Sequence, residues 1–176
     1  MPATPSTGPV AGLYTPEQRA RRDGTVWTLV QGLLAPVQFL VFLASLGLVV
    51  YSLRTGELLG WALGSVVLKT VLLYAIMVTG CIWEKVVFGC YLFAPAFYWE
   101  DVFSMLVLAL HTLYLVAWTQ NSLEVRALLF LALAAYAAYI INAVQFLLKL
   151  KAARVQAEAV QGAHSTTPLM QNGEGA

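Results

Sequence analysis

The residues best suited to chemistry gather in one stretch, Trp83–Asp101, which reads W-E-K-V-V-F-G-C-Y-L-F-A-P-A-F-Y-W-E-D. This stretch holds three of the chain's nine carboxylates and seven aromatic rings. The carboxylates are Glu84, Glu100 and Asp101, and the rings nearest them in sequence are Trp83, Phe97, Tyr98 and Trp99. An aromatic, partly desolvated setting lets a carboxyl group keep its proton and act as an acid. The pattern therefore predicts a site for acid–base chemistry on a flat, apolar substrate.

Two ionisable residues, Lys69 and His111, lie inside long apolar runs, where such groups are costly and often functional. At 1.5 Å per helical residue, Lys69 lies about 21 Å from Trp83 and His111 about 16 Å from Glu100. The two side chains could therefore meet or flank one cavity. They could equally be structural, with Lys69 paired to a carbonyl or carboxylate and His111 satisfied in the core.

Side-chain amides add further polar positions to the apolar runs. Gln31 and Gln38 are seven residues apart and share a helix face, as do Asn142 and Gln145, three apart. The simplest arrangement turns these polar faces inward, around a cavity open to the cytoplasm. The alternative is that the amides only join helices by hydrogen bonds.

The elements that must position these residues are apolar helices. The chain has 60% hydrophobic and 11% charged residues, a balance typical of a polytopic membrane protein. Four runs are long enough to cross a bilayer core of about 30 Å. They are Val26–Leu53, about Leu58–Trp83, Trp99–Thr119 and Val125–Leu150. We predict an all-α fold, a four-helix transmembrane bundle over residues 26–155.

Polar segments flank the predicted bundle. We expect a disordered leader over residues 1–13, an amphipathic interfacial segment over residues 14–25 and a disordered tail over residues 156–176. Within the interfacial segment, Thr15, Pro16 and Gln18 are typical of a capped helix start.

Basic residues near the predicted helix ends indicate the orientation. Only Arg54 and Arg126 fall on one side of the bundle. Seven fall on the side of both termini and the predicted loop Trp83–Asp101: Arg19, Arg21, Arg22, Lys85, Lys149, Lys151 and Arg154. We therefore expect both termini and this loop to face the cytoplasm. The net charge of +1 provides no field that would recruit nucleic acid.

The sequence lacks the residues that several other kinds of site require. Cys81 and Cys90 form no metal-ligand spacing, and a bis-histidine haem site would need a partner for His111 other than His164 in the polar tail. The chain has no glycine-rich phosphate loop and no Gly-x-Ser-x-Gly motif. Acids and base candidates remain, which favours addition or elimination of water, or proton transfer.

Several motifs resemble the vinyl-bacteriochlorophyllide hydratase family. They are Tyr14-Thr15-Pro16-Glu17, Trp27-Thr28-Leu29-Val30-Gln31-Gly32, Ala35-Pro36-Val37-Gln38-Phe39-Leu40-Val41-Phe42, Ile82-Trp83-Glu84-Lys85-Val86-Val87-Phe88-Gly89, Tyr91-Leu92-Phe93-Ala94-Pro95-Ala96-Phe97, Trp99-Glu100-Asp101-Val102, Ala109-Leu110-His111-Thr112, Asn142 and Gln145-Phe146-Leu147 with Lys149-Leu150. The resemblance covers about Leu13 to Arg154. It implies hydration of the ring A (C3) vinyl group of a chlorophyllide-type macrocycle to a 1-hydroxyethyl group, in bacteriochlorophyll synthesis. It further implies no redox cofactor and a location in the inner, cytoplasmic or intracytoplasmic, membrane of a phototrophic bacterium.

Given this resemblance, we expect Glu84 and Glu100 to form the acid–base pair, with Asp101 as the alternate. His111 could ligate the substrate's magnesium, and Lys69 or Lys85 could pair with its propionate. The remaining residues expected to contact the macrocycle are Trp83, Phe97, Tyr98, Trp99, Gln38, Asn142 and Gln145. Partners would be the macrocycle and membrane lipid, and could include other enzymes of bacteriochlorophyll synthesis. The alternative function is a protein that binds or hands over pigment without chemistry.

Overall fold

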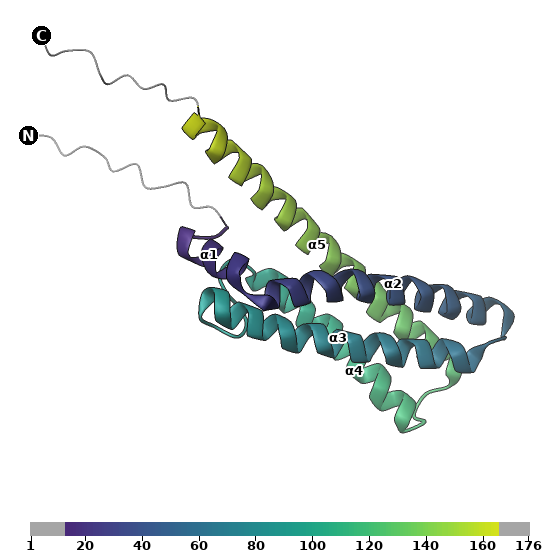
Figure 1. Ribbon diagram of the computed structural model, residues 1–176. Helices are drawn as coiled ribbons and strands as arrows, with labels where there is room; N and C mark the ends of the chain where they lie inside the picture. Colours follow the sequence, from purple (N-terminus) through teal and green to yellow (C-terminus); the bar gives the residue numbers. More distant parts are fainter. Residues whose placement is uncertain (1–12, 166–176) are drawn as a thin grey trace, which may run out of the picture.

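The computed structural model describes residues 13–165, and side chains to residue 155. The predicted leader up to residue 12 and the predicted tail from residue 166 lie outside the described residues. The described part is all-helical, which confirms the predicted fold class (Figure 1). Its helices are α1 (Pro16–Gly24), α2 (Val26–Thr55), α3 (Leu59–Phe88), α4 (Tyr98–Thr119) and α5 (Val125–Ser165).

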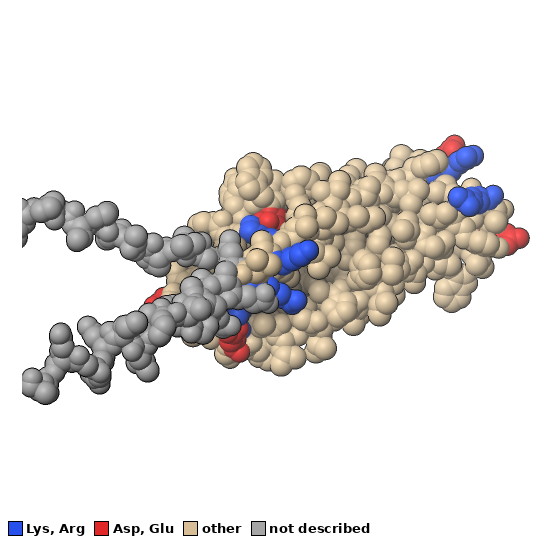
Figure 2. All heavy atoms as spheres, turned by 90° about the horizontal axis from the view of Figure 1, so that it is seen from above, with Lys and Arg blue, Asp and Glu red and all other residues tan. Residues whose placement is uncertain are grey.

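Four of these helices are long and apolar enough to cross a membrane, as predicted. They are α2, α3, α4 and the Val125–Val155 part of α5. Large apolar side chains point outward from them, such as Leu29, Leu40 and Leu147, each about two-thirds exposed. Figure 2 shows a broad band without charges between two charged ends. Such a surface suits a lipid environment rather than water.

The short helix α1 lies at the end of the bundle where α2 begins (Figure 1). Its predicted capping box is confirmed. The Gln18 backbone N–H donates to the Thr15 hydroxyl at 3.2 Å, and the Thr15 N–H donates to the Gln18 side-chain oxygen at 2.9 Å. The Arg21 guanidinium donates to the Val87 carbonyl at 3.4 Å, near the end of α3. Helix α1 is thereby fixed beside the loop that follows α3.

Two helix ends differ from the sequence prediction. Helix α3 runs to Phe88 and α4 begins at Tyr98, so Glu84 and Lys85 are helical and the connecting loop is only residues 89–97. The helix continues because no breaking residue occurs before Gly89, which has φ +88° and donates its N–H to the Lys85 carbonyl. At the other end of the chain, α5 continues to Ser165, past residue 156 where we expected the tail to start.

The bundle consists of two closely packed antiparallel pairs, α2 with α3 and α4 with α5 (Figure 1). Hydrogen bonds fix the register of the first pair, from Gln31 Nε2 to Thr79 Oγ1 at 2.7 Å and between the Ser45 and Ser65 hydroxyls at 2.6 Å. The Tyr136 hydroxyl of α5 meets the Ser45 hydroxyl at 2.6 Å and joins the two pairs. The helix ends far from α1 enclose the main apolar core, and the ends near α1 enclose an aromatic cluster.

Candidate carboxylate site

The carboxyl groups of Glu84 on α3 and Asp101 on α4 lie next to each other. Both residues are buried, with 6% and 4% of their surface exposed. Two negative charges at such a buried contact would repel each other, so the favoured state has one carboxyl group protonated and the other ionised. The contact therefore provides one proton donor and one proton acceptor side by side.

The loop between α3 and α4 closes over this pair through its backbone. The Phe93 N–H donates to Asp101 Oδ2 at 2.7 Å, and the Ala94 N–H donates to Glu84 Oε2 at 3.4 Å. Phe93 has φ +61°, a left-handed conformation that is strained for a residue with a bulky side chain. The strained turn allows two successive N–H groups to reach two different carboxyl groups. Backbone donors therefore position both acids.

Glu100 has a different partner from its neighbour Asp101. Its Oε2 accepts from Lys149 Nζ of α5 at 2.6 Å, and the same ammonium lies 5.1 Å from the Phe97 ring centroid. Successive helical residues are turned by about 100°, so Asp101 faces α3 while Glu100 faces α5. The expected partner of Glu84 was Glu100, but the structure brings Glu84 together with Asp101, the alternate.

The four predicted aromatic residues divide into two settings. Trp83 and Phe97 lie inside the aromatic cluster, packed edge to face with ring centroids 5.8 Å apart. Trp83 Nε1 also donates to the Thr28 hydroxyl at 2.9 Å. Tyr98 and Trp99 lie outside the cluster and are 47% and 67% exposed. The first two rings can shape a site, whereas the last two face the surroundings of the protein.

Tyr14 is a member of the aromatic cluster that we did not predict as a site residue. Its ring stacks on Phe88 at 5.7 Å and is tilted against Phe97 at 6.3 Å. Burial raises the pKa of Tyr14, and the Arg22 guanidinium, 4.8 Å from the ring centroid, opposes that effect. Its place in a motif of the resemblance was the only sequence signal, because a single aromatic residue ahead of a short helix predicts little.

Lys69, His111 and Gln38 lie in the middle of the bundle, with 0%, 0% and 3% of their surface exposed. Lys69 Nζ lies 3.8 Å from the Tyr139 ring centroid. The ring centroids of His111 and Tyr136 are 5.9 Å apart, and Tyr136 lies one turn from Tyr139 on the same face of α5. His111 Nδ1 is 2.8 Å from the Val107 carbonyl oxygen. The two ionisable residues thus face adjacent tyrosines of one helix.

The other predicted polar residues have separate contacts. Asn142 Nδ2 donates to the Ser104 hydroxyl at 2.9 Å, and Gln145 Oε1 is buried without a partner. Lys85 Nζ donates to the Gly89 carbonyl at 2.8 Å, so it caps α3 and does not pair with Glu84. Sequence reasoning missed Ser104 as a polar residue on the buried face of α4, although it is one turn after Asp101. It also gave Lys149 no role in the site, although Lys149 served to indicate the orientation and belongs to a motif of the resemblance.

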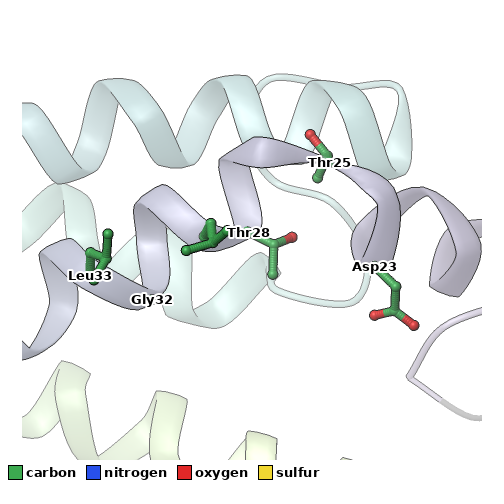
Figure 3. A pocket seen from close by; sticks show the side chains of 6 residues that line it. Asp23, Thr25, Thr28, Gly32 and Leu33 are labelled. Atoms are coloured by element: carbon green, nitrogen blue, oxygen red, sulfur yellow. The ribbon is translucent and has the colours of Figure 1, made fainter.

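Two open hollows mark the surface near α1. One, of about 420 Å³, runs along the start of α2, and Figure 3 shows Asp23 at its rim and Leu33 at its far end. It touches neither carboxyl of the pair. The other, of about 450 Å³, is lined by Leu13, Gln18, Phe88, Pro95, Ala96 and Lys149. The second hollow adjoins the loop that covers Glu84 and Asp101, and it combines apolar walls with an ammonium group.

No cluster of three or more His, Cys, Asp or Glu side chains within the described residues could hold a metal ion. The arrangement instead offers paired acids, stacked rings and a nearby cation. Such a set can transfer protons to and from an aromatic substrate that carries an acidic group.

Comparison with known proteins identifies the family of this chain. The sequence model of the 2-vinyl bacteriochlorophyllide hydratase family matches residues 14–152. A 2-vinyl bacteriochlorophyllide hydratase of Cereibacter sphaeroides is 61% identical over 162 residues, which is 92% of this chain and the full length of that relative. One of Rhodobacter capsulatus is 60% identical over 157 residues, covering 89% of this chain and 91% of the relative. No solved structure matches. The resemblance noted between Leu13 and Arg154 is therefore confirmed, and the chain belongs to the 2-vinyl bacteriochlorophyllide hydratase family.

Proposed function

We propose that this protein adds water to the vinyl group of a bacteriochlorophyllide, as the names of its relatives state for them, and that Glu84 and Asp101 carry the reaction. The family membership supports the activity. The single observation that supports the site is the buried contact between the two carboxyl groups. This proposal replaces the expected Glu84–Glu100 pair by the pair that the helices bring together.

The reaction needs one acid and one base. The protonated carboxyl group of the pair gives its proton to the terminal vinyl carbon, and the macrocycle delocalises the cation that forms on the carbon next to the ring. The ionised carboxyl group takes a proton from the water that attacks this cation. The product is a 1-hydroxyethyl group, and the pair again holds one proton. The protein therefore needs no external proton donor for a turnover.

Access to the pair is proposed from the hollow beside the loop. A chlorophyllide carries a free carboxylate, and the Lys149 ammonium in that hollow offers it a partner. Lys69, one of the two cations expected for this role, is wholly buried, and Lys85 caps α3. The charge distribution along the sequence supports a site on the cytoplasmic face of the inner, or intracytoplasmic, membrane. Lipid would surround the exposed apolar faces, and other enzymes of the pathway could exchange pigment at this end.

Magnesium ligation by His111 is a separate prediction with a different geometry. His111 follows Asp101 by ten residues, a rise of about 15 Å along α4. That rise exceeds the distance from the centre of a chlorin to its vinyl carbons. A macrocycle ligated by His111 would therefore hold its vinyl group away from the carboxyl pair. A His111→Ala protein should bind pigment with an unchanged absorption band if the carboxyl pair is the site.

The test is single replacement of each carboxyl group, Glu84→Gln and Asp101→Asn, in the full-length purified protein. We expect conversion of vinyl to hydroxyethyl pigment, followed by chromatography, to fall by about 10²- to 10⁴-fold, the usual worth of a positioned acid or base. Glu124→Gln, at the opposite end of the bundle, is the matched control and should keep full activity. Full activity in both Glu84→Gln and Asp101→Asn would refute the assignment.

A pigment-binding or handover protein is the competing function, and the unpartnered polar atoms inside the bundle are the observation in its favour. Incubation of the purified protein with vinyl pigment in ¹⁸O-water separates the two functions. The proposed hydratase incorporates ¹⁸O into the hydroxyethyl group, whereas a carrier returns the pigment unlabelled.

A further inference from the structure

Within the described residues, five buried side-chain atoms have no hydrogen-bond partner. They are Gln38 Oε1, Lys69 Nζ, His111 Nε2, Asn142 Oδ1 and Gln145 Oε1. Such atoms are rare in folded proteins, because a buried polar group without a partner is costly. Each one therefore indicates a contact that the protein's own groups do not provide.

Contacts and helix spacing place the five residues at levels from that of the carboxyl pair to the middle of the bundle. Ser104 is one turn beyond Asp101 on α4, is buried, and is bonded to Asn142. Gln145 is one turn from Asn142, on the side of the Glu100–Lys149 ion pair. The unpartnered amide oxygens of Gln145 and Asn142 thus lie on α5 at about the level of the carboxyl pair and one turn further inward.

The inner end of this path is formed by Lys69, His111 and Gln38. Lys69 faces Tyr139, which precedes Asn142 by one turn of α5 and lies closer to the middle of the bundle. Gln38 lies midway between Gln31 and Ser45 of α2, whose bonds to Thr79 and Ser65 set the register with α3. That register places Gln38 level with the turn of α3 that begins at Lys69.

The chemistry of the five atoms selects their missing partner. His111 Nδ1 faces a carbonyl oxygen, which only accepts, so Nδ1 carries the hydrogen and Nε2 of the neutral ring is an acceptor. The path therefore presents four acceptors and one ammonium donor. A cation would be repelled by Lys69, and an anion would meet the lone pairs of the acceptors. Water both donates and accepts, so it can satisfy the hydrogen-bonding capacity of all five atoms.

We propose that these residues hold a buried file of water molecules that leads from Lys69, His111 and Gln38 to the carboxyl pair and supplies the water consumed in hydration. The inference rests on the function proposed above. The file would bring water to the reacting vinyl group, which belongs to an apolar pigment bound in a membrane protein. Water reaches the cation from inside the bundle while the pigment covers the side facing the hollow.

The first test is radiolytic hydroxyl-radical labelling of the unmodified full-length protein. Radicals form in place from bound water, so a buried side chain is oxidised only where water touches it. His111 and Tyr114 are both 0% exposed on α4, but the Tyr114 hydroxyl already donates to the Leu63 carbonyl. We expect oxidation of His111 and none of Tyr114, although tyrosine is the more reactive side chain. An unmodified His111, or equal oxidation of both, would overturn the inference.

The second test separates supply of water from binding of pigment. Asn142→Leu keeps the branching and the number of heavy atoms of the side chain but removes its polar groups, and so interrupts the file. We expect kcat to fall by about tenfold, the worth of one water-mediated hydrogen bond, with KM unchanged. Asn142→Ser should recover most of the kcat because its hydroxyl again holds water. Tyr114→Phe, which removes a hydrogen bond outside the file, should keep the original kcat and KM.

The outcomes distinguish the two proposals. A wild-type kcat in Asn142→Leu, or a fall that Asn142→Ser does not reverse, would overturn the water file. Oxidation of His111 together with full activity of Glu84→Gln and Asp101→Asn would refute only the assigned acids. Inactive carboxyl variants together with an unmodified His111 would refute only the file.

Discussion

At the scale of residues, three carboxyl groups within one end of the bundle have different partners. Glu84 and Asp101 contact each other and two backbone N–H groups, so they can share a proton. Glu100 contacts the Lys149 ammonium, which joins α4 to α5. We therefore propose a catalytic role for the first two and a positioning role for the third.

The Glu100–Lys149 pair predicts a coupled loss of stability. Lys149→Met should lower the free energy of unfolding by about 2 kcal/mol, between the values for exposed and buried pairs, because it leaves the Glu100 carboxylate buried without a counter-ion. The double variant Glu100→Gln/Lys149→Met should lose less than the sum of the two single variants. Denaturant unfolding of the purified protein measures all three. Strict additivity would show that the 2.6 Å contact contributes no coupling.

At the scale of elements, the short loop after α3 determines the geometry of the site. Gly89 ends α3 in a left-handed conformation with φ +88°, and the loop then turns back over the carboxyl pair. A Cβ atom at Gly89 would meet nothing within 4 Å, so the position requires glycine for its backbone conformation and not for space.

Gly89→Ala should therefore lower the free energy of unfolding by about 1–2 kcal/mol, the cost of a left-handed conformation for a residue with a Cβ. It should also reduce activity, because the loop donors move away from the carboxyl groups. Gly64→Ala is the matched control on α3, since it also has open space around it but has no positive φ. Thermal unfolding and the hydration assay measure both effects. Equal losses in the two variants would contradict the explanation.

The sequence predicted the helices better than their contacts. Hydropathy identified the four spans, because an apolar run of sufficient length has few alternatives in a bilayer. The end of α3 was placed too early, since the charges of Glu84 and Lys85 lower hydropathy without breaking a helix. The partner of Glu84 depends on the rotation of α4 about its axis, and adjacent carboxylates at Glu100 and Asp101 give no sign of which one faces α3.

At the scale of the whole molecule, two antiparallel helix pairs meet along a polar middle, with α1 at one end. An even number of spans brings the α1 end and the outgoing end of α5 to the same side of the bundle (Figure 1). The face of the membrane on which that side lies stays a prediction from the basic residues.

Reporter fusions test this orientation. Alkaline phosphatase, which folds only in the periplasm, should be active when fused after Gly56 or after Asn121 and inactive when fused after Arg154. A fluorescent protein that matures only in the cytoplasm should give the reverse pattern at the same three positions. Phosphatase activity after Arg154 would reverse the proposed orientation and place the carboxyl site on the periplasmic face.

The loop over the carboxyl pair also limits which sequences the family can explore. The side chains of residues 93 and 94 do not hold the acids, since only their N–H groups do. Other residues could therefore replace Phe93, best those that readily adopt its left-handed conformation, whereas Ala94 is fully buried and has no room for a larger side chain. Proline is the exception, because it has no N–H, and at either position it would leave one acid without its backbone donor. Pro95 is tolerated one residue later, where it favours an extended Ala94. What both positions must supply is thus the hydrogen atom of a backbone N–H.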